Sequence, residues 1–183
     1  MPSIGNNNSK KTFRMLIAYR GSSFCGWQRQ KDHRLPSVQC VVEDTLTQLL
    51  NEPVNIRVAG RTDAGVHAVR QVARLQTRQT VSSEQLQSFL ADRLDRNVCR
   101  VYGIEQVSNK FHPTFDTKTR SYVYVMDAKH IQHCCRVANM TELVERLNQE
   151  LHPLLQQDLD YTGLGYGKIT TETTNCTLTY AHA

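Results

Sequence analysis

The segments Thr12–Tyr19, TFRMLIAY, and Ser37–Leu50, SVQCVVEDTLTQLL, decide the fold. The first is rich in residues that favour strands, and Gly21 closes it. In the second, apolar residues recur at helical spacing between Pro36 and Asn51. The sequence therefore predicts a strand, a long polar loop and an amphipathic helix in that order.

The elements expected next complete a familiar pattern. Short strands at Asn55–Ala59 and Val69–Thr77 flank a loop that contains glycines. Ser82 and Gln85 have the spacing of a capping box and predict a second helix, which a strand near Val98–Val107 follows. The order β-α-β-β-α-β is typical of a ferredoxin-like unit, in which both helices cover one face of an antiparallel sheet. RNA-recognition modules use the other, free face.

A second unit is expected to begin and to remain incomplete. Arg120–Met126 alternates as a strand, and Asn139 with Glu142 can cap an amphipathic helix. Further strands are expected around Leu159–Leu164 and over Cys176–Ala181. We therefore expect a mixed α/β (α+β) chain with a polar, disordered tail over residues 1–11, a first domain over 12–108 and a second, incomplete domain over 109–183.

Composition limits the class of protein. With 183 residues and 39% apolar side chains, the chain can bury a core as one domain or two small ones. We find no apolar run of membrane-spanning length and no secretory signal in MPSIGNNNSKK, residues 1–11. The six cysteines show neither zinc-ribbon spacing nor the density of a disulfide scaffold. We expect a globular protein without a membrane partner in a reducing compartment, the cytoplasm, with the nucleus or an organelle left open.

A cluster of His130, His133, Cys134 and Cys135 suggests zinc at first sight. Adjacent cysteines are poor joint ligands for a tetrahedral ion, and no second pair of ligands follows. We expect no metal site.

The net charge of +5 is unevenly distributed. Residues 12–78 contain ten Lys or Arg and five acidic residues, whereas residues 79–183 contain ten and twelve. A basic region attracts phosphate backbones, although solvated basic surfaces are also common in proteins that bind no nucleic acid.

The segment Ala59–Ala68, AGRTDAGVHA, carries the densest set of functional side chains. Gly60 and Gly65 let the backbone turn tightly and approach a ligand. A carboxylate such as Asp63 beside the Arg61 guanidinium stays ionised at neutral pH and can act as nucleophile or base. The alternative is structural, with Asp63 capping a turn and Arg61 lying on the surface.

Four segments resemble a known family. AGRTDAGVHA matches without departure the segment that holds the catalytic aspartate in TruA-type tRNA pseudouridine synthases. Tyr19–Gln30, YRGSSFCGWQRQ, is similar to that family's YDGTxFxGWQxQ, and Ser37–Leu46, SVQCVVEDTL, is similar to its TVQxxLExxL helix. Phe111–Val125, FHPTFDTKTRSYVYV, resembles FHARFxAxxRxYxYxI. The segments follow one another in the family's order.

The resemblance implies a function and a site. Asp63 would be the catalytic aspartate, Tyr122 would contact the target uracil, and Arg61 would position the RNA or the carboxylate. The implied fold has two units like RNA-recognition modules, their sheets fused around a basic RNA cleft. The implied protein is a homodimer that isomerises uridine to pseudouridine in the anticodon stem and loop of tRNA without a cofactor. The candidates for phosphate contacts are Arg14, Arg20, Arg29, Lys31, Arg34, Arg70, Arg74 and Arg78.

Structural roles remain the alternative for these residues. Tyr122 on a strand face would ordinarily serve packing, and many of the arginines would be solvated surface. Two departures from the family pattern also matter: Arg20 replaces an Asp, and after DYTGLGYGKITTETTNCTL, from Asp160, no NGFLxxQVR-like motif follows. Three hypotheses result: a fragment of a longer synthase, a shortened enzyme completed by a dimer or partner chain, and a catalytically impaired RNA-binding module.

Overall fold

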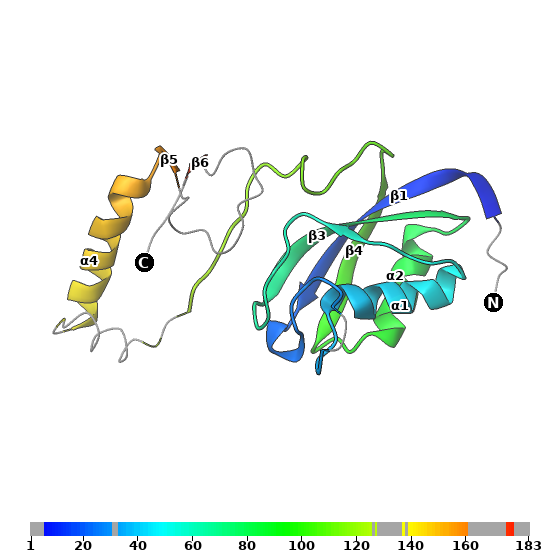
Figure 1. Ribbon diagram of the computed structural model, residues 1–183, viewed down its shortest axis with the longest axis horizontal. Helices are drawn as coiled ribbons and strands as arrows, with labels where there is room; N and C mark the ends of the chain where they lie inside the picture. The colour runs from blue at the N-terminus through cyan, green and yellow to red at the C-terminus, as the bar shows by residue number, and fades with distance from the viewer. Residues whose placement is uncertain are drawn as a thin grey trace. The chain divides into compact units, whose positions relative to one another are not determined.

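The computed structural model describes residues 6–30, 33–125, 127, 137, 139–160 and 175–177. These residues form a mixed α+β structure with a four-stranded antiparallel sheet and three α-helices (Figure 1). The chain divides into two compact units, residues 1–120 and 121–183, and each is described by itself. The domain division after residue 108 that the sequence suggested stays a prediction. In the described ranges, no helix has the length and apolar character needed to cross a membrane.

The first unit contains the elements β1 (Asn6–Tyr19), η1 (Gly21–Ser23), α1 (Val38–Leu50), β2 (Arg57–Val58), β3 (Ala68–Gln79), α2 (Ser83–Arg93) and β4 (Cys99–Val107). Its strands pair in the spatial order β2-β3-β1-β4, and every pair is antiparallel. Helices α1 and α2 lie side by side against the sheet (Figure 1). The element order is the one expected, although β2 is shorter than predicted.

The start of β1 differs from the expectation of a disordered tail. The strand begins at Asn6, which lies opposite Gln79, while Lys11 lies opposite Thr77. Pairing with the end of β3 holds this polar stretch by its backbone, and backbone pairing leaves no hydrophobic signal in the sequence. The predicted tail is therefore wrong for residues 6–11.

The hydrophobic core lies between the sheet and the two helices. Alternate residues of β1 point toward the helices, so Phe13, Met15 and Ile17 are fully buried. The apolar positions of α1 face them, and burial of one such side chain contributes about 1.5–3 kcal/mol. The remaining fully buried core residues are Trp27, Val38, Val42, Leu46, Leu50, Ala73, Leu75, Leu86 and Leu90.

The predicted helix starts are confirmed by their caps. The Ser37 hydroxyl accepts a hydrogen bond from the Cys40 N–H at 3.1 Å. In the capping box of α2, Ser82 Oγ accepts from the Gln85 N–H, and Gln85 Oε1 accepts from the Ser82 N–H. Asn51 ends α1 in the left-handed conformation, at φ 49°. These caps satisfy backbone groups that the helix itself leaves without partners.

The second unit contains α4 (Met140–Leu151), η2 (His152–Leu154), β5 (Asp158–Asp160) and β6 (Asn175–Thr177), and β5 pairs with β6. Asn139 caps α4 as predicted, since its Oδ1 accepts from the Glu142 N–H at 2.9 Å. The strand predicted for 120–126 is wrong for residues 120–125, which form no strand. A strand needs a paired neighbour, and no described strand pairs with this segment. Most residues of the strands expected over 159–164 and 176–181 lie outside the residues that the structure describes.

Candidate catalytic loop and its surroundings

The loop that connects β2 to β3 presents Asp63 to solvent. Residues 63–67 are exposed, whereas Thr62 is half-buried. The Asp63 carbonyl accepts a hydrogen bond from the Val66 N–H at 3.2 Å, which closes a tight turn. Gly65 lies in the left-handed region at φ +83°, where a residue with a Cβ is strained. The turn thus carries a carboxylate at its accessible tip.

Thr62 fastens this loop to the core. Its carbonyl accepts a hydrogen bond from the Trp27 N–H at 2.9 Å. Its hydroxyl lies 2.8 Å from the hydroxyl of the buried Tyr19. The Tyr19 ring in turn contacts the rings of Phe24 and Trp27. The residue before Asp63 is therefore anchored to buried aromatic side chains.

Two glycines let the segment that follows β1 pass directly beneath the loop. A Cβ on Gly21 would lie 2.1 Å from the Val66 carbonyl oxygen, and one on Gly26 would lie 2.9 Å from that of Thr62. Gly26 also has φ +110°. No side chain fits at either place unless the backbone moves, so both positions need glycine for close approach.

The base of the loop is held from β3. The Ala59 N–H donates to the Val72 carbonyl at 2.9 Å, and Gln71 Nε2 donates to the Gly60 carbonyl at 2.7 Å. Together with the contacts of Thr62, these bonds hold the loop at both ends. Support of this kind holds a side chain in one place, which in enzymes is how a catalytic group is preorganised.

The other residues predicted for the site have separate surroundings. Arg61 is exposed, and among the described residues it forms no ion pair with Asp63. The structure therefore does not bring together the carboxylate and guanidinium that the sequence suggested as neighbours. Tyr122 is 76% exposed and belongs to the second unit.

Arg120 is a residue of this site that we did not predict. Its Nη2 donates to the Ala59 carbonyl at 3.0 Å, and its Nε lies 3.4 Å from the place where a Cβ on Gly60 would stand. The guanidinium thus covers the start of the loop. The signal that could have found it is its place in the segment FHPTFDTKTRSYVYV, two residues before Tyr122.

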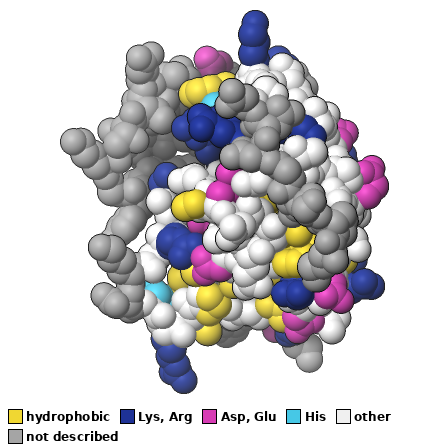
Figure 2. Space-filling model, turned by 90° about the vertical axis from the view of Figure 1, so that its right-hand side faces the viewer, with side chains coloured by type: hydrophobic (Ala, Val, Ile, Leu, Met, Phe, Trp, Pro, Cys, Tyr) yellow, Lys and Arg dark blue, Asp and Glu magenta, His cyan; other side chains and the backbone are white. Residues whose placement is uncertain are grey.

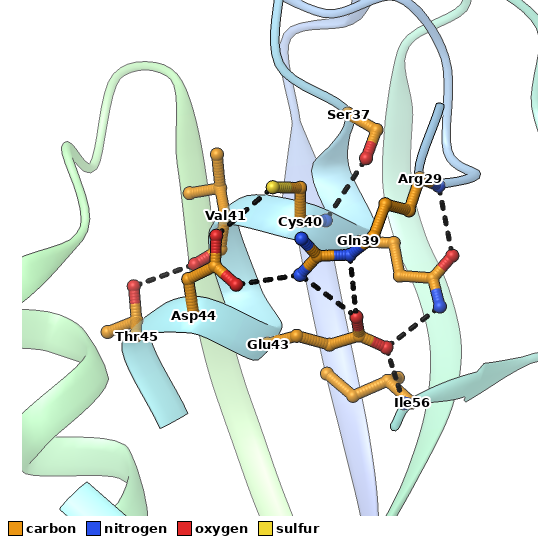
Figure 3. Close-up of polar contacts among 9 residues, drawn as sticks. All are labelled: Arg29, Ser37, Gln39, Cys40, Val41, Glu43, Asp44, Thr45 and Ile56. Atoms are coloured by element: carbon orange, nitrogen blue, oxygen red, sulfur yellow. Dashed lines mark hydrogen bonds and ion pairs between the residues drawn. The ribbon is translucent and has the colours of Figure 1, made fainter. Parts of the chain in front are cut away.

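Arg29, predicted to bind RNA, forms ion pairs within the protein (Figure 3). Its guanidinium lies 2.7 Å from Asp44 and 3.3 Å from Glu43, both on α1. The Glu43 carboxylate, only 6% exposed, also accepts from the buried Ile56 N–H at 2.8 Å and from the Gln39 side chain. The hydrogen bond that Arg29 donates to the Asp44 carboxylate lowers the pKa of Asp44 and raises the pKa of Arg29. This network ties α1 to the segment that enters β2.

The other predicted phosphate contacts differ in exposure. Arg20 and Arg70 are exposed, and Lys31 lies outside the described residues. Arg74 is partly buried and donates to the Phe111 carbonyl at 2.8 Å. Burial lowers the pKa of Arg74, and the nearby charge of Arg57 lowers it further.

A row of charged residues crosses the sheet face that lies away from the helices. Arg57, Arg74, Arg14 and Glu105 lie opposite one another on successive strands. The Glu105 carboxylate forms an ion pair with the Arg14 guanidinium at 2.6 Å. In the described part of the chain, no carboxylate pairs with Arg57. Figure 2 shows one side of the molecule, on which basic and acidic side chains are interspersed.

The segment 108–120, here called the strap, crosses this sheet face. Thr12 Oγ1 donates to Asn109 at 2.9 Å, and Thr114 Oγ1 donates to the Val58 carbonyl at 3.1 Å. The bond from Arg74 to the Phe111 carbonyl lies between these two anchors along the chain. The strap therefore covers part of a face that the sequence predicted to be free.

A metal centre finds no support in the residues that the structure describes, where no group of three or more His, Cys, Asp or Glu could hold an ion. His130, His133, Cys134 and Cys135 lie outside them.

Comparison with known proteins gives a consistent result. Residues 15–116 match a family model described as tRNA pseudouridine synthase. A protein named tRNA pseudouridine synthase A from Thermodesulfovibrio yellowstonii is 36% identical over 113 residues, which cover 62% of this chain and 43% of the relative. Proteins of the same name from Anaplasma marginale (strain Florida) and Ehrlichia canis are 32% and 37% identical; these matches cover 74% and 61% of this chain and 55% and 45% of the relatives. The chain spans about half the length of the curated relatives it matches.

Proposed function

The chain belongs to the tRNA pseudouridine synthase family, and we propose that it isomerises uridine to pseudouridine in tRNA with Asp63 as its catalytic residue. The observation that carries the proposal is an exposed carboxylate on a loop anchored to the core through Thr62. The family match includes this loop and the strands that hold it. Pure RNA binding would not require such a carboxylate.

The reaction fits a site made of protein side chains. The C1′–N1 bond of uridine breaks, the base turns, and a C1′–C5 bond forms, while the C5 proton is lost and N1 gains one. No electron is transferred to or from the substrate, so no redox partner takes part. Asp63 attacks the sugar C1′ as a nucleophile or removes a proton on the way to a glycal. In both routes the loop must hold the carboxylate against the sugar.

Substrate binding completes the proposal. A stacked uridine must leave its helix before reaction, and the exposed ring of Tyr122 packs on its face. Arg61 orients the RNA beside the loop. Arg20, Arg29, Lys31, Arg70 and Arg74 are the proposed phosphate contacts; Arg29 and Arg74 would have to rearrange, because both donate to groups of the protein.

The architecture is proposed to follow the same family. The first unit is ferredoxin-like, which its element order and its strand order β2-β3-β1-β4 support. The second unit has the same plan in incomplete form, and the two sheets fuse around a basic cleft. We further propose a cytoplasmic homodimer that acts on the anticodon stem and loop.

The test is direct. The 183-residue chain is incubated with a tRNA transcript, the RNA is digested, and the nucleosides are separated by chromatography. Pseudouridine is expected with the wild-type chain and not with Asp63→Asn, which keeps the shape of the side chain. Binding of tRNA without pseudouridine would instead assign an RNA-binding module without turnover.

A further inference from the structure

Phe115 is a large apolar side chain that the strap leaves in solvent. It is 81% exposed, although a phenylalanine gains about 1.5–3 kcal/mol from burial. One side of its ring is covered by His112, with ring centroids 4.2 Å apart and an angle of 27° between the planes. The other side of the ring is therefore available to a planar ligand.

The turn that presents Phe115 is ordered by its own hydrogen bonds. The His112 N–H donates to the Asp116 carboxylate at 2.9 Å, and the Asp116 N–H donates back to the His112 carbonyl at 2.9 Å. Pro113, between the two aromatic residues, is buried. The backbone that carries the two rings is thus ordered before any ligand arrives, which lowers the entropy cost of binding.

The strap fixes this turn to the sheet. Thr114, directly before Phe115, donates from its hydroxyl to the Val58 carbonyl of β2. Phe111, directly before His112, receives the hydrogen bond of Arg74 from β3. The ring pair therefore stands on the two strands that flank the Asp63 loop, with an anchor next to each of its members.

Positive charge lies beside the same anchors. Arg57 is exposed and directly precedes Val58, the residue that Thr114 binds. It is close enough to Arg74 to lower the pKa of that guanidinium, so the charges of the two cations are not fully compensated. A phosphate at Arg57 would relieve this repulsion.

We propose that Phe115, supported by His112, is a stacking platform for an unpaired base of the RNA substrate, with the adjoining phosphate at Arg57. The inference rests on the proposed function and adds a second base contact to it, apart from the target uridine. A single exposed phenylalanine is ordinary on a protein surface. A rigid ring pair with one free face beside an uncompensated arginine is the arrangement by which proteins hold single-stranded RNA.

The experiment compares two RNA ligands on the full chain. One is a hairpin with 2-aminopurine in its unpaired loop, and the other is a fully paired duplex. Phe115→Leu removes the aromatic face and Phe115→Trp retains it. Phe89→Leu is the matched control, because Phe89 lies on α2. Affinity is measured by fluorescence anisotropy, and stacking is measured by quenching of the 2-aminopurine.

We expect Phe115→Leu to weaken hairpin binding by about 5- to 150-fold and to abolish the quenching. Duplex binding should stay within about twofold, and Phe115→Trp and Phe89→Leu should bind both ligands like the wild type. Three outcomes would overturn the inference. Phe115→Leu could keep the wild-type affinity for the hairpin, it could lose equal affinity for hairpin and duplex, or the wild-type chain could bind no hairpin.

Assaying pseudouridine formation with the same preparations keeps the two proposals apart. If Phe115→Leu binds like the wild type while Asp63-dependent product forms, the stacking platform is wrong and the synthase stands. If hairpin affinity falls as expected while no chain forms product, the synthase activity is wrong and the platform stands.

Discussion

Gly21→Ala tests how tightly the Asp63 loop is held. The new Cβ would lie 2.1 Å from the Val66 carbonyl oxygen, 2.3 Å from the Val66 carbonyl carbon and 2.7 Å from that of Gly65. These atoms belong to the backbone of the loop, so no side chain can rotate away. Gly21 does not have a positive φ, so alanine adds no backbone strain and the effect is steric.

The size of the effect follows from the overlap. Ordinary contact begins at 3.4 Å, so the loop must move by about 1 Å or more. Overpacking of this kind costs about 1–3 kcal/mol of the free energy of unfolding. A displacement of about 1 Å at a catalytic group costs on the order of 100-fold in rate. We therefore expect a folded variant whose kcat falls far more than its affinity for tRNA.

The assay measures kcat, the tRNA dissociation constant and the urea midpoint of the variant. Gly103→Ala is the matched control, because the atoms nearest to its Cβ would belong to the Leu16 side chain, Cδ1 at 3.1 Å, Cγ at 3.4 Å and Cβ at 3.5 Å, on the sheet face crossed by the strap. That variant should retain the wild-type kcat. A Gly21→Ala protein with wild-type kcat and stability would refute the claim that contact with Gly21 sets the position of the loop.

Three further predictions concern other groups. Tyr19→Phe removes the hydroxyl 2.8 Å from that of Thr62 and should lower the free energy of unfolding by about 0.5–1.5 kcal/mol in urea, with a fall in kcat. The hydrogen bond from Arg29 lowers the pKa of Asp44, so this ion pair stabilises the fold above the unfolded-state pKa and loses its effect as the pH falls through the folded value. For so exposed a pair we expect less than about 1 kcal/mol, and urea titrations from pH 6 to about 3 should show that Asp44→Asn lacks this component. Burial raises the pKa of the Cys99 thiol to about 12, so iodoacetamide at about pH 8 should modify it in urea but not in the folded chain, as peptide mass spectrometry would show.

The regular elements could be predicted because local signals specify them. The helical spacing between Pro36 and Asn51 located α1, and the Ser82 capping box located α2. β2 was predicted too long, since the extent of a strand depends on its partner: only Arg57 and Val58 pair with β3. The strand expected over residues 120–126 does not form over residues 120–125 for the same reason.

The site was predictable in part. Its glycines and its resemblance to a family single out the loop that carries Asp63. The need for Gly21 follows from close approach to Val66, a contact that spans 45 residues of sequence and leaves no local pattern. The strap was missed because its turns have no periodicity. The internal partners of Arg29 and Arg74 are set by the fold, and a basic residue has the same appearance in sequence whether it binds phosphate or a carbonyl.

Release of tritium from tRNA labelled at C5 of uridine tests the central claim most directly, because pseudouridine formation must displace that hydrogen. The predicted result is that the wild-type chain releases tritium and Asp63→Asn does not, while both proteins still bind tRNA. Equal release by the two proteins, or none from a wild-type chain that binds tRNA, would contradict the assignment of Asp63 as the catalytic residue of an active synthase.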